Sequence, residues 1–326
     1  MKKHDLVVFG NCATVQMLKF KDMPHIGQTE TAVNPFADEI FYGGCAFNVF
    51  YGLTRLGVKS YPVLTYADIR FKDKIYEICR EYGLETDAIE GPPIRSYSTC
   101  LMLEDSSQNH ITIMYHFGED SDKESVEFCP HTIKPEYFRD SKMALMVMGN
   151  PGTGYQLTEE IRKSGIPLAF SYRNDPRLLP KKLLDEILPL AEVLFTNEAE
   201  AEYLEKLYGQ KHITDWFATG KAKVIVTTLG KNGSRIYSKN EDGTYNTVEV
   251  PITCAKNGAI SAVGAGDGYV AGFMYGYING KSLELCGQYG STLSSFVLEK
   301  EGSTTNLPTL EQLLARNAQR PDALEE

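Results

Sequence analysis

A glycine-rich turn followed by an apolar helix constrains this chain of 326 residues more than any other stretch. The turn reads Ser-Ala-Val-Gly-Ala-Gly-Asp and ends at Asp267, and residues 269–278 after it are apolar on nearly every side. Gly264 and Gly266 allow a tight backbone turn that other residues resist. A helix that is apolar all round is predicted to be buried. Such a turn directs backbone N–H groups at one place, which favours an anion such as phosphate.

Asp267 is an unusual neighbour for a phosphate, because a carboxylate repels it. The choice makes sense if Asp267 removes a proton from a hydroxyl group that attacks the phosphate. The alternative is structural, since Asp is a common helix N-cap and small residues allow close packing. A dinucleotide-binding motif is excluded because Tyr269 stands where its third glycine belongs. A Walker A loop is excluded because the spacing from Gly276 to Gly280 is one residue too short.

Composition limits the size of the core, the kinds of partner and the cellular compartment that we expect for this chain. With 42% hydrophobic and 23% charged residues, the chain can fill one large core or two ordinary ones. The net charge of −10 argues against a nucleic-acid partner. The seven cysteines are scattered and form no C-x-x-C pair, which indicates a reducing compartment and no zinc site. We see no signal peptide and no membrane-spanning run, so we expect a cytoplasmic protein without a membrane partner.

Strand and helix patterns alternate along the chain. Residues 6–10 predict a buried first strand that ends at Gly10, and helical and strand patterns then follow in turn. This alternation favours a parallel sheet with helical crossovers. Residues 96–103 and 110–115 alternate around a polar loop and predict a hairpin. We assign this hairpin to a lid that would exclude water from a reaction.

Three further motifs precede the glycine turn, and each is weak alone. Two of them begin helices, where the same residues are common as caps. The third is a glycine turn after a buried strand. A loop residue, Arg173, could neutralise phosphate, although a lone loop Arg is more often solvated. The motifs are Gly43 and Gly44 with Asn48, Asn197 with Glu200, and Thr228 with Gly230 and Gly233.

In their order and across most of the chain, these four motifs resemble those of the PfkB (ribokinase-like) kinase family. The resemblance implies an α/β fold, a three-layer αβα sandwich with a central, mostly parallel sheet and a small β-sheet lid. It implies one kinase domain over residues 1–316, with the lid at about 11–40 and 94–118, and a polar C-terminal tail at 317–326. The implied reaction transfers the γ-phosphoryl group of ATP to a hydroxymethyl group of a ribonucleoside or sugar.

The resemblance also implies roles for individual residues. Asp267 is the expected catalytic base, in an anion hole lined by Gly264, Ala265 and Gly266. Glu200 is expected to orient Mg²⁺ through water. The acceptor is expected to contact Asn11, Gly43, Gly44 and Asn48. The nucleotide is expected to contact Asn197, Thr228, Gly230 and Gly233.

Two positions depart from the family pattern. Val15 stands where the family has an Asp that holds sugar hydroxyl groups, which leaves the identity of the acceptor open. Ser261 stands where the family has an Asp that helps to shape a potassium site. The implied cofactors are therefore ATP and Mg²⁺, with K⁺ left open.

Residues 115–118, 196–197 and 288–305 are similar to the adenosine-kinase-like branch of the family, so we favour a ribonucleoside acceptor. Two alternatives stay open. One is a PfkB sugar kinase with an unusual acceptor, and the other is a catalytically weak ligand-binding protein on the same fold. The expected partner is a small-molecule nucleoside or sugar. We expect a monomer, or a homodimer that pairs through the exposed edge of the lid.

Overall fold

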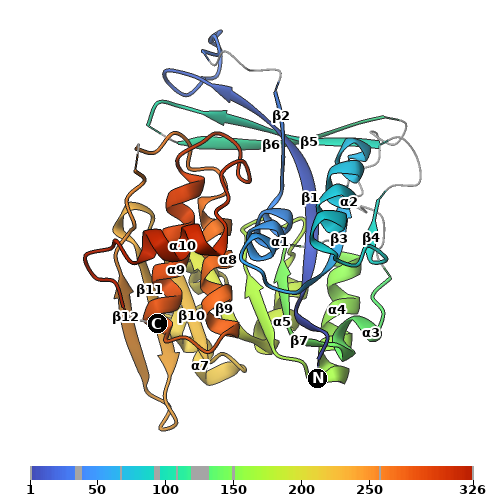
Figure 1. Cartoon of the computed structure of the whole chain (residues 1–326), viewed down its shortest axis with the longest axis vertical. Coiled ribbons are helices and arrows are strands. Elements are labelled where there is room, and N and C mark those ends of the chain that lie inside the picture. The colour runs from blue at the N-terminus through green and yellow to red at the C-terminus, as the bar shows by residue number, and fades with distance from the viewer. Residues whose placement is uncertain are drawn as a thin grey trace.

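The computed structural model describes residues 2–33, 39–66, 68–91, 96–107, 109–118, 132–148, 151–256 and 258–324. Of residues 96–98 and 115–118, the backbone alone is described. A large, mostly parallel sheet forms the middle of the molecule, and a small second sheet lies across one end of it (Figure 1). None of the helices in the described ranges is long and apolar enough to cross a membrane.

The central sheet is organised around β1 (His4–Lys19). Its side chains alternate between two faces, so that Leu6 and Val8 join one core while Val7 and Phe9 join the other. The strand order is β12-β11-β10-β9-β8-β7-β1-β3-β4, and all neighbours are parallel except at β11 and β12. The other strands are β3 (Ser60–Tyr66), β4 (Ile89–Glu90), β7 (Ser141–Val147), β8 (Leu168–Ser171), β9 (Ala191–Asn197), β10 (Val224–Thr228), β11 (Ser234–Lys239) and β12 (Tyr245–Val250).

Helices cover both faces of this sheet, so the expected three-layer αβα sandwich is confirmed. One face carries α1 (Cys45–Arg55), α2 (Lys72–Tyr82), α8 (Ala265–Ile278), α9 (Leu283–Val297) and α10 (Leu310–Asn317). The other carries α3 (Glu136–Arg139), α4 (Pro151–Ser164), α5 (Lys181–Ile187), α6 (Glu198–Tyr208) and α7 (Trp216–Thr219). Single-turn 3₁₀ helices cover Ile69–Phe71, Leu188–Leu190, Ile213–Asp215 and Gly230–Asn232.

The lid sheet is built on the second half of β1. Through Cys12 this strand pairs with β3. Beyond it, residues 13–16 pair with β2 (Ile40–Gly43) and residues 14–19 with β5 (Ser96–Glu104). β6 (His110–Gly118) completes the predicted hairpin with β5. Figure 1 shows β1 rising from the amino terminus at the bottom of the view into the lid at the top. Because β1 belongs to both sheets, the lid is held next to the carboxyl ends of the central strands.

The expectation that the first strand ends at Gly10 is wrong. The strand continues to Lys19 because the lid strands supply new backbone partners where the central strands end. A local pattern cannot reveal this change of partners. Parts of the expected lid, residues 34–38 and 94–95, lie outside the described residues.

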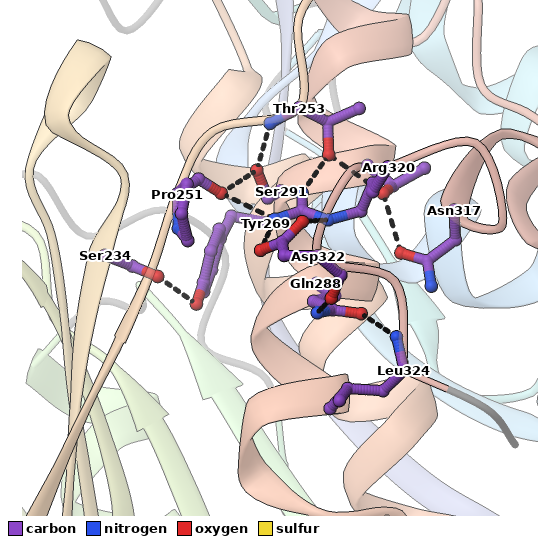
Figure 2. Close-up of polar contacts among 11 residues, drawn as sticks. Ser234, Pro251, Thr253, Tyr269, Gln288, Ser291, Asn317, Arg320, Asp322 and Leu324 are labelled. Carbon is purple, nitrogen blue, oxygen red and sulfur yellow. Dashed lines mark hydrogen bonds and ion pairs between the residues drawn. The ribbon is translucent and has the colours of Figure 1, made fainter.

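Within the expected polar C-terminal tail, Asn317 and Arg320 are buried, whereas residues 318, 319 and 321–324 are exposed. Arg320 is 7% exposed, and its guanidinium donates to the Pro251 carbonyl at 3.0 Å and to the Thr253 hydroxyl (Figure 2). The side chain of Gln288 donates to the carbonyl of Asp322 and accepts from the backbone N–H of Leu324. Arg320 and the backbone of Asp322 and Leu324 therefore tie this segment to the loop after β12 and to α9.

Candidate active site

A cavity of about 460 Å³ opens between the lid and the carboxyl ends of the central strands. Asn11, Thr65, Asn197 and Thr228 reach it from β1, β3, β9 and β10. Crevices at the carboxyl ends of parallel strands are common ligand sites, and this volume suits a small-molecule ligand. The starts of α1 and α8 close the cavity on another side, through Cys45 and Asp267 among others.

The predicted glycine turn forms the start of α8. Gly264 has φ of 80°, and a Cβ atom there would lie 2.3 Å from the Cβ of Ser303, so glycine is required on both counts. The first N–H groups of a helix have no partner within the helix and attract anions. Gly264 and Gly266 line the cavity. Ala265 is not a lining residue, and its N–H donates to the carbonyl of Ala262 within the turn.

Asp267 follows this turn and is 5% exposed. The side-chain amide of Asn48 donates to Oδ2 of Asp267 at 2.8 Å, and Arg173 Nη2 donates to Oδ1 at 2.6 Å. The Ser303 hydroxyl in turn donates to the amide oxygen of Asn48 at 2.7 Å and fixes the direction of that amide. We call Asp267, Asn48, Arg173 and Ser303 the Asp267 cluster. The structure brings together two residues from separate motifs, and adds two that the motifs do not contain.

Arg173 lies in the loop after β8 and is not the solvated side chain that sequence reasoning favoured. Its side chain is 21% exposed, and Nη1 donates to the Ser171 hydroxyl at 3.1 Å and to the Tyr172 carbonyl at 2.8 Å. Burial works against the charged guanidinium, but the charges of Asp267, Cys45 and Glu200 together outweigh burial, and the pKa of Arg173 is raised. The contact joins residues 94 positions apart, so no local pattern could have predicted it.

Asn197 and Glu200 form a capping box at the start of α6. The Asn197 side chain accepts from the Glu200 N–H, and Glu200 Oε2 accepts from the Asn197 N–H, both at 2.8 Å. The structural interpretation of this motif is therefore correct. Both residues also line the cavity, and burial raises the pKa of Glu200 although the charge of Arg173 opposes it. The same pair can cap a helix and face a ligand.

The other predicted site residues divide into two groups. Asn11, Gly44 and Thr228 line the cavity. Gly44 begins α1 with φ of 89°, and a Cβ atom there would lie 2.8 Å from the backbone nitrogen of Ala13. The close approach of α1 to β1 therefore needs a glycine. The predicted residues that are not among the lining residues are Gly43, Gly230 and Gly233.

The lid contributes an apolar side of the cavity that sequence reasoning did not identify. Val15 lies in a buried cluster with Cys100 and Met102, against which Met114 and Val263 pack, and all five line the cavity. We call these five residues the lid wall. Alternation along β5 and β6 indicates which side chains share a face. It does not indicate which face meets the cavity.

Comparison with known proteins identifies the family. The model of the pfkB family carbohydrate kinases matches residues 3–310. The nucleoside kinase of Methanothermobacter thermautotrophicus is 26% identical over 313 residues, which cover 96% of this chain and 95% of the relative. Among solved structures, the Methanocaldococcus jannaschii nucleoside kinase has a TM-score of 0.77 at 23% identity and covers 98% of this chain and 99% of its own. The Burkholderia thailandensis nucleoside kinase in complex with inosine has a TM-score of 0.77 at 21% identity, over 95% and 97% of the two chains.

The two solved structures share the fold of this chain, with the same layers and a similar extent. The family match extends over nearly the whole chain, from β1 to the start of α10, and so includes every residue of the Asp267 cluster. Named kinases for both nucleosides and sugar acids are found among its relatives. This chain belongs to the pfkB family of carbohydrate kinases and is an ATP-dependent phosphotransferase with an alcohol group as acceptor.

Proposed function

We propose that this chain transfers the γ-phosphoryl group of ATP to the hydroxymethyl group of a ribonucleoside, with Asp267 as the base. The observation that carries the proposal is the position of Asp267, whose carboxylate lies beside the glycine turn at the start of α8 and lines the cavity. A base and an anion-binding helix start at one place are what phosphoryl transfer to a hydroxyl group needs.

In the proposed reaction, the acceptor oxygen attacks the γ-phosphorus atom. A new oxygen–phosphorus bond forms, the bond to the β-phosphate oxygen breaks, and ADP leaves with that electron pair. Asp267 takes the proton of the acceptor hydroxyl, and Asn48 holds the carboxylate in place through its 2.8 Å hydrogen bond. The N–H groups at the start of α8 stabilise the charge that develops on the phosphoryl oxygens. The lid keeps water from competing as acceptor.

Glu200 fits the role proposed for it toward Mg²⁺. Its carboxylate lines the cavity and is held there by hydrogen bonds from the backbone of Asn197 and Asn174. Mg²⁺ in kinases is held largely by phosphate oxygens and water, with few protein ligands. Among the described residues there is no cluster of three or more His, Cys, Asp or Glu side chains that would form a protein cage. When bound, the ion would neutralise charge on the ATP oxygens.

The residues around Ser261 do not fit a potassium ion. Ser261 is buried and its hydroxyl donates to Glu104 at 3.3 Å. The ammonium group of Lys19 donates to the carbonyl of Ile260 at 3.3 Å and lies 3.6 Å from Glu104. A positive charge is thus already present where a monovalent cation would need oxygen ligands. We therefore propose that turnover does not depend on K⁺.

The lid wall supports a nucleoside over a free sugar. A sugar carries hydroxyl groups on most sides, and hydroxyl groups placed against Val15, Met102 and Met114 would lose their hydrogen bonds to water without replacement. The flat base of a nucleoside can pack on these side chains. Relatives named as nucleoside kinases support the same choice, with an adenosine-like purine nucleoside as the favoured acceptor.

The test is ADP release with Mg²⁺ and ATP across nucleosides, ribose, fructose and dehydrogluconates, with and without K⁺. We expect kcat/KM for inosine or adenosine to exceed that for ribose at least about tenfold, the size of one well-filled apolar contact. Faster turnover of a free sugar would favour the sugar-kinase alternative. If no acceptor gave ADP release although ATP still bound, the result would favour the alternative of a catalytically weak ligand-binding protein.

A further inference from the structure

Arg173 is the one member of the Asp267 cluster that carries a positive charge, and two buried carboxylates act on it. It bonds directly to Asp267, and the charges of both Asp267 and Glu200 act on it. Asp267 and Glu200 are 5% and 6% exposed, so water screens neither strongly. The proposed function would bring a third negative group, the γ-phosphate, into this space, and the inference below rests on that function.

The inner cavity has few other cations. Arg177 also lines the cavity, but its side chain is 64% exposed and pairs with Asp175 at 3.4 Å. His110, on the lid, is an exposed residue. Within the described ranges, Arg173 is therefore the lining Arg or Lys whose charge is most shielded from water. A buried phosphate needs such a charge near it, because an unpaired buried charge is costly.

The hydrogen bonds of Arg173 leave one donor for a further ligand. A guanidinium has five N–H donors in a fixed fork. Nη1 uses its two on Ser171 and Tyr172, and Nη2 uses one on Asp267. The guanidinium also bonds to the Cys45 thiol, which leaves one of the five donors. The first two bonds anchor the fork to the loop after β8, so the group is held at the cavity without using its whole capacity.

The geometry of the reaction places the phosphorus atom near the guanidinium. The acceptor oxygen must lie about 3 Å from Asp267 to give up its proton, and the phosphorus must lie about 3–3.5 Å from that oxygen. The phosphorus is then within about 6.5 Å of the Asp267 carboxylate. Arg173 Nη2 lies 2.6 Å from Oδ1 of the same carboxylate. A small rotation of the guanidinium would reach the equatorial phosphoryl oxygens.

We propose that Arg173 is a further catalytic residue, which pairs with Asp267 before the substrates bind and donates to the γ-phosphoryl oxygens during transfer. The guanidinium keeps its charge and shifts its contact from the Asp267 carboxylate to the transferring phosphoryl group. This shift accompanies the movement of the acceptor proton to Asp267 and the breaking of the bond between the γ-phosphorus and the β-phosphate oxygen. An arginine that only positioned the base would contact Asp267 throughout and would add nothing to the binding of the phosphoryl group. The two roles differ in one measurable quantity.

That quantity is the affinity for ADP with aluminium fluoride, which imitates the transferring phosphoryl group, compared with ADP alone. Both are titrated calorimetrically with Mg²⁺ and the best acceptor present, in the wild type, Arg173→Gln and Arg173→Lys. We expect Arg173→Gln to weaken binding of ADP with aluminium fluoride about 10²-fold and kcat by about 10²–10³-fold, as for loss of one transition-state donor. The dissociation constant for ADP alone should stay within about twofold. Arg173→Lys should recover part of the affinity for ADP with aluminium fluoride and part of kcat.

Arg235→Gln is the matched control, because Arg235 forms an exposed pair with Glu249 on the β11–β12 hairpin and is not a cavity residue. It should leave every affinity unchanged, and thermal unfolding should show that all variants fold. Equal affinity of Arg173→Gln and wild type for ADP with aluminium fluoride would overturn the inference, as would an equal loss for ADP alone. If the wild type itself did not bind ADP with aluminium fluoride, the proposed function would fail, and this inference with it.

Discussion

The Asp267 cluster and the lid wall line the same cavity and are built in opposite ways. The cluster is polar, and its members are joined by hydrogen bonds of 2.6–2.8 Å between α1, α8, the loop after β8 and Ser303. The lid wall is apolar and lies mainly on strands of the small sheet. A bonded polar cluster fixes direction and charge, whereas an apolar wall fixes shape. We infer that the cluster determines the reaction and the wall selects the acceptor.

The largest effect is expected from Asp267→Asn, which keeps the size of the side chain and removes the proposed base. We expect kcat to fall by about 10³-fold, within the 10²–10⁴ range of general base catalysis. The affinity for ATP, measured by calorimetry, should change by less than about threefold. Turnover near the wild-type rate would show that the cluster does not supply the base.

Gly264→Ala is expected to have the next largest effect, because the added Cβ atom would overlap Ser303, the residue that holds Asn48. We expect kcat/KM for ATP to fall about 10²-fold and the free energy of unfolding to fall by about 1–3 kcal/mol. Gly57→Ala is the control, since Gly57 has φ of 79° and no atom within 4 Å of its added Cβ. Gly57→Ala should lower the free energy of unfolding through backbone strain without lowering kcat/KM for ATP. An equal loss of kcat/KM in the two variants would contradict the role of the turn.

Val15→Asp tests the lid wall by giving it a carboxylate. The Val15 side chain cannot form a hydrogen bond. In the wild type, kcat/KM for a ribonucleoside should therefore exceed kcat/KM for its 2′-deoxy form by less than about tenfold. The Asp variant should raise that ratio of kcat/KM values about tenfold or more, because a buried carboxylate left without a hydroxyl partner is costly. Val15→Ile is the control. An unchanged ratio would mean that the acceptor hydroxyl groups do not face Val15.

Arg320→Ala should lower stability without changing kcat or KM, because Arg320 belongs neither to the Asp267 cluster nor to the lid wall. It is buried and bonds to Pro251 and Thr253. We expect the free energy of unfolding to fall by about 1–3 kcal/mol, with kcat and KM within about twofold of wild type. Arg235→Ala, which breaks an exposed ion pair, should cost less than about 0.5 kcal/mol. A large kinetic change in Arg320→Ala would show that the C-terminal segment acts on the cavity.

The smallest expected effect concerns acid stability. Burial opposes ionisation of Glu299, but hydrogen bonds from Arg316 and the backbone of Lys256 outweigh it, and the pKa of Glu299 is lowered. A lowered carboxyl pKa stabilises the fold above the unfolded value of about 4.3 and loses that contribution as the pH falls through the folded value. Glu299→Gln should therefore be less stable than wild type at pH 7, with a smaller difference near pH 3. A difference that did not depend on pH would contradict this origin.

The sequence predicted the layered fold and the parts of the site that depend on local pattern. Gly264, Gly266 and Asp267 were identified because a glycine turn before a buried helix is visible in one stretch of chain. The partners of Asp267 could be predicted less well. Arg173 and Ser303 reach the cavity from loops whose positions depend on the whole sheet. The extension of β1 and the packing of Arg320 were missed for the same reason, since each depends on contacts between segments far apart in sequence.

The central claim is that this cavity directs the γ-phosphoryl group to a hydroxymethyl group and away from water. Phosphorus-31 NMR of a reaction with Mg²⁺, ATP and inosine or adenosine tests it most directly. The account predicts a phosphomonoester coupled to two methylene protons, formed in a one-to-one ratio with ADP and absent with Asp267→Asn. ADP accompanied only by inorganic phosphate, or a phosphate on another hydroxyl group, would contradict it.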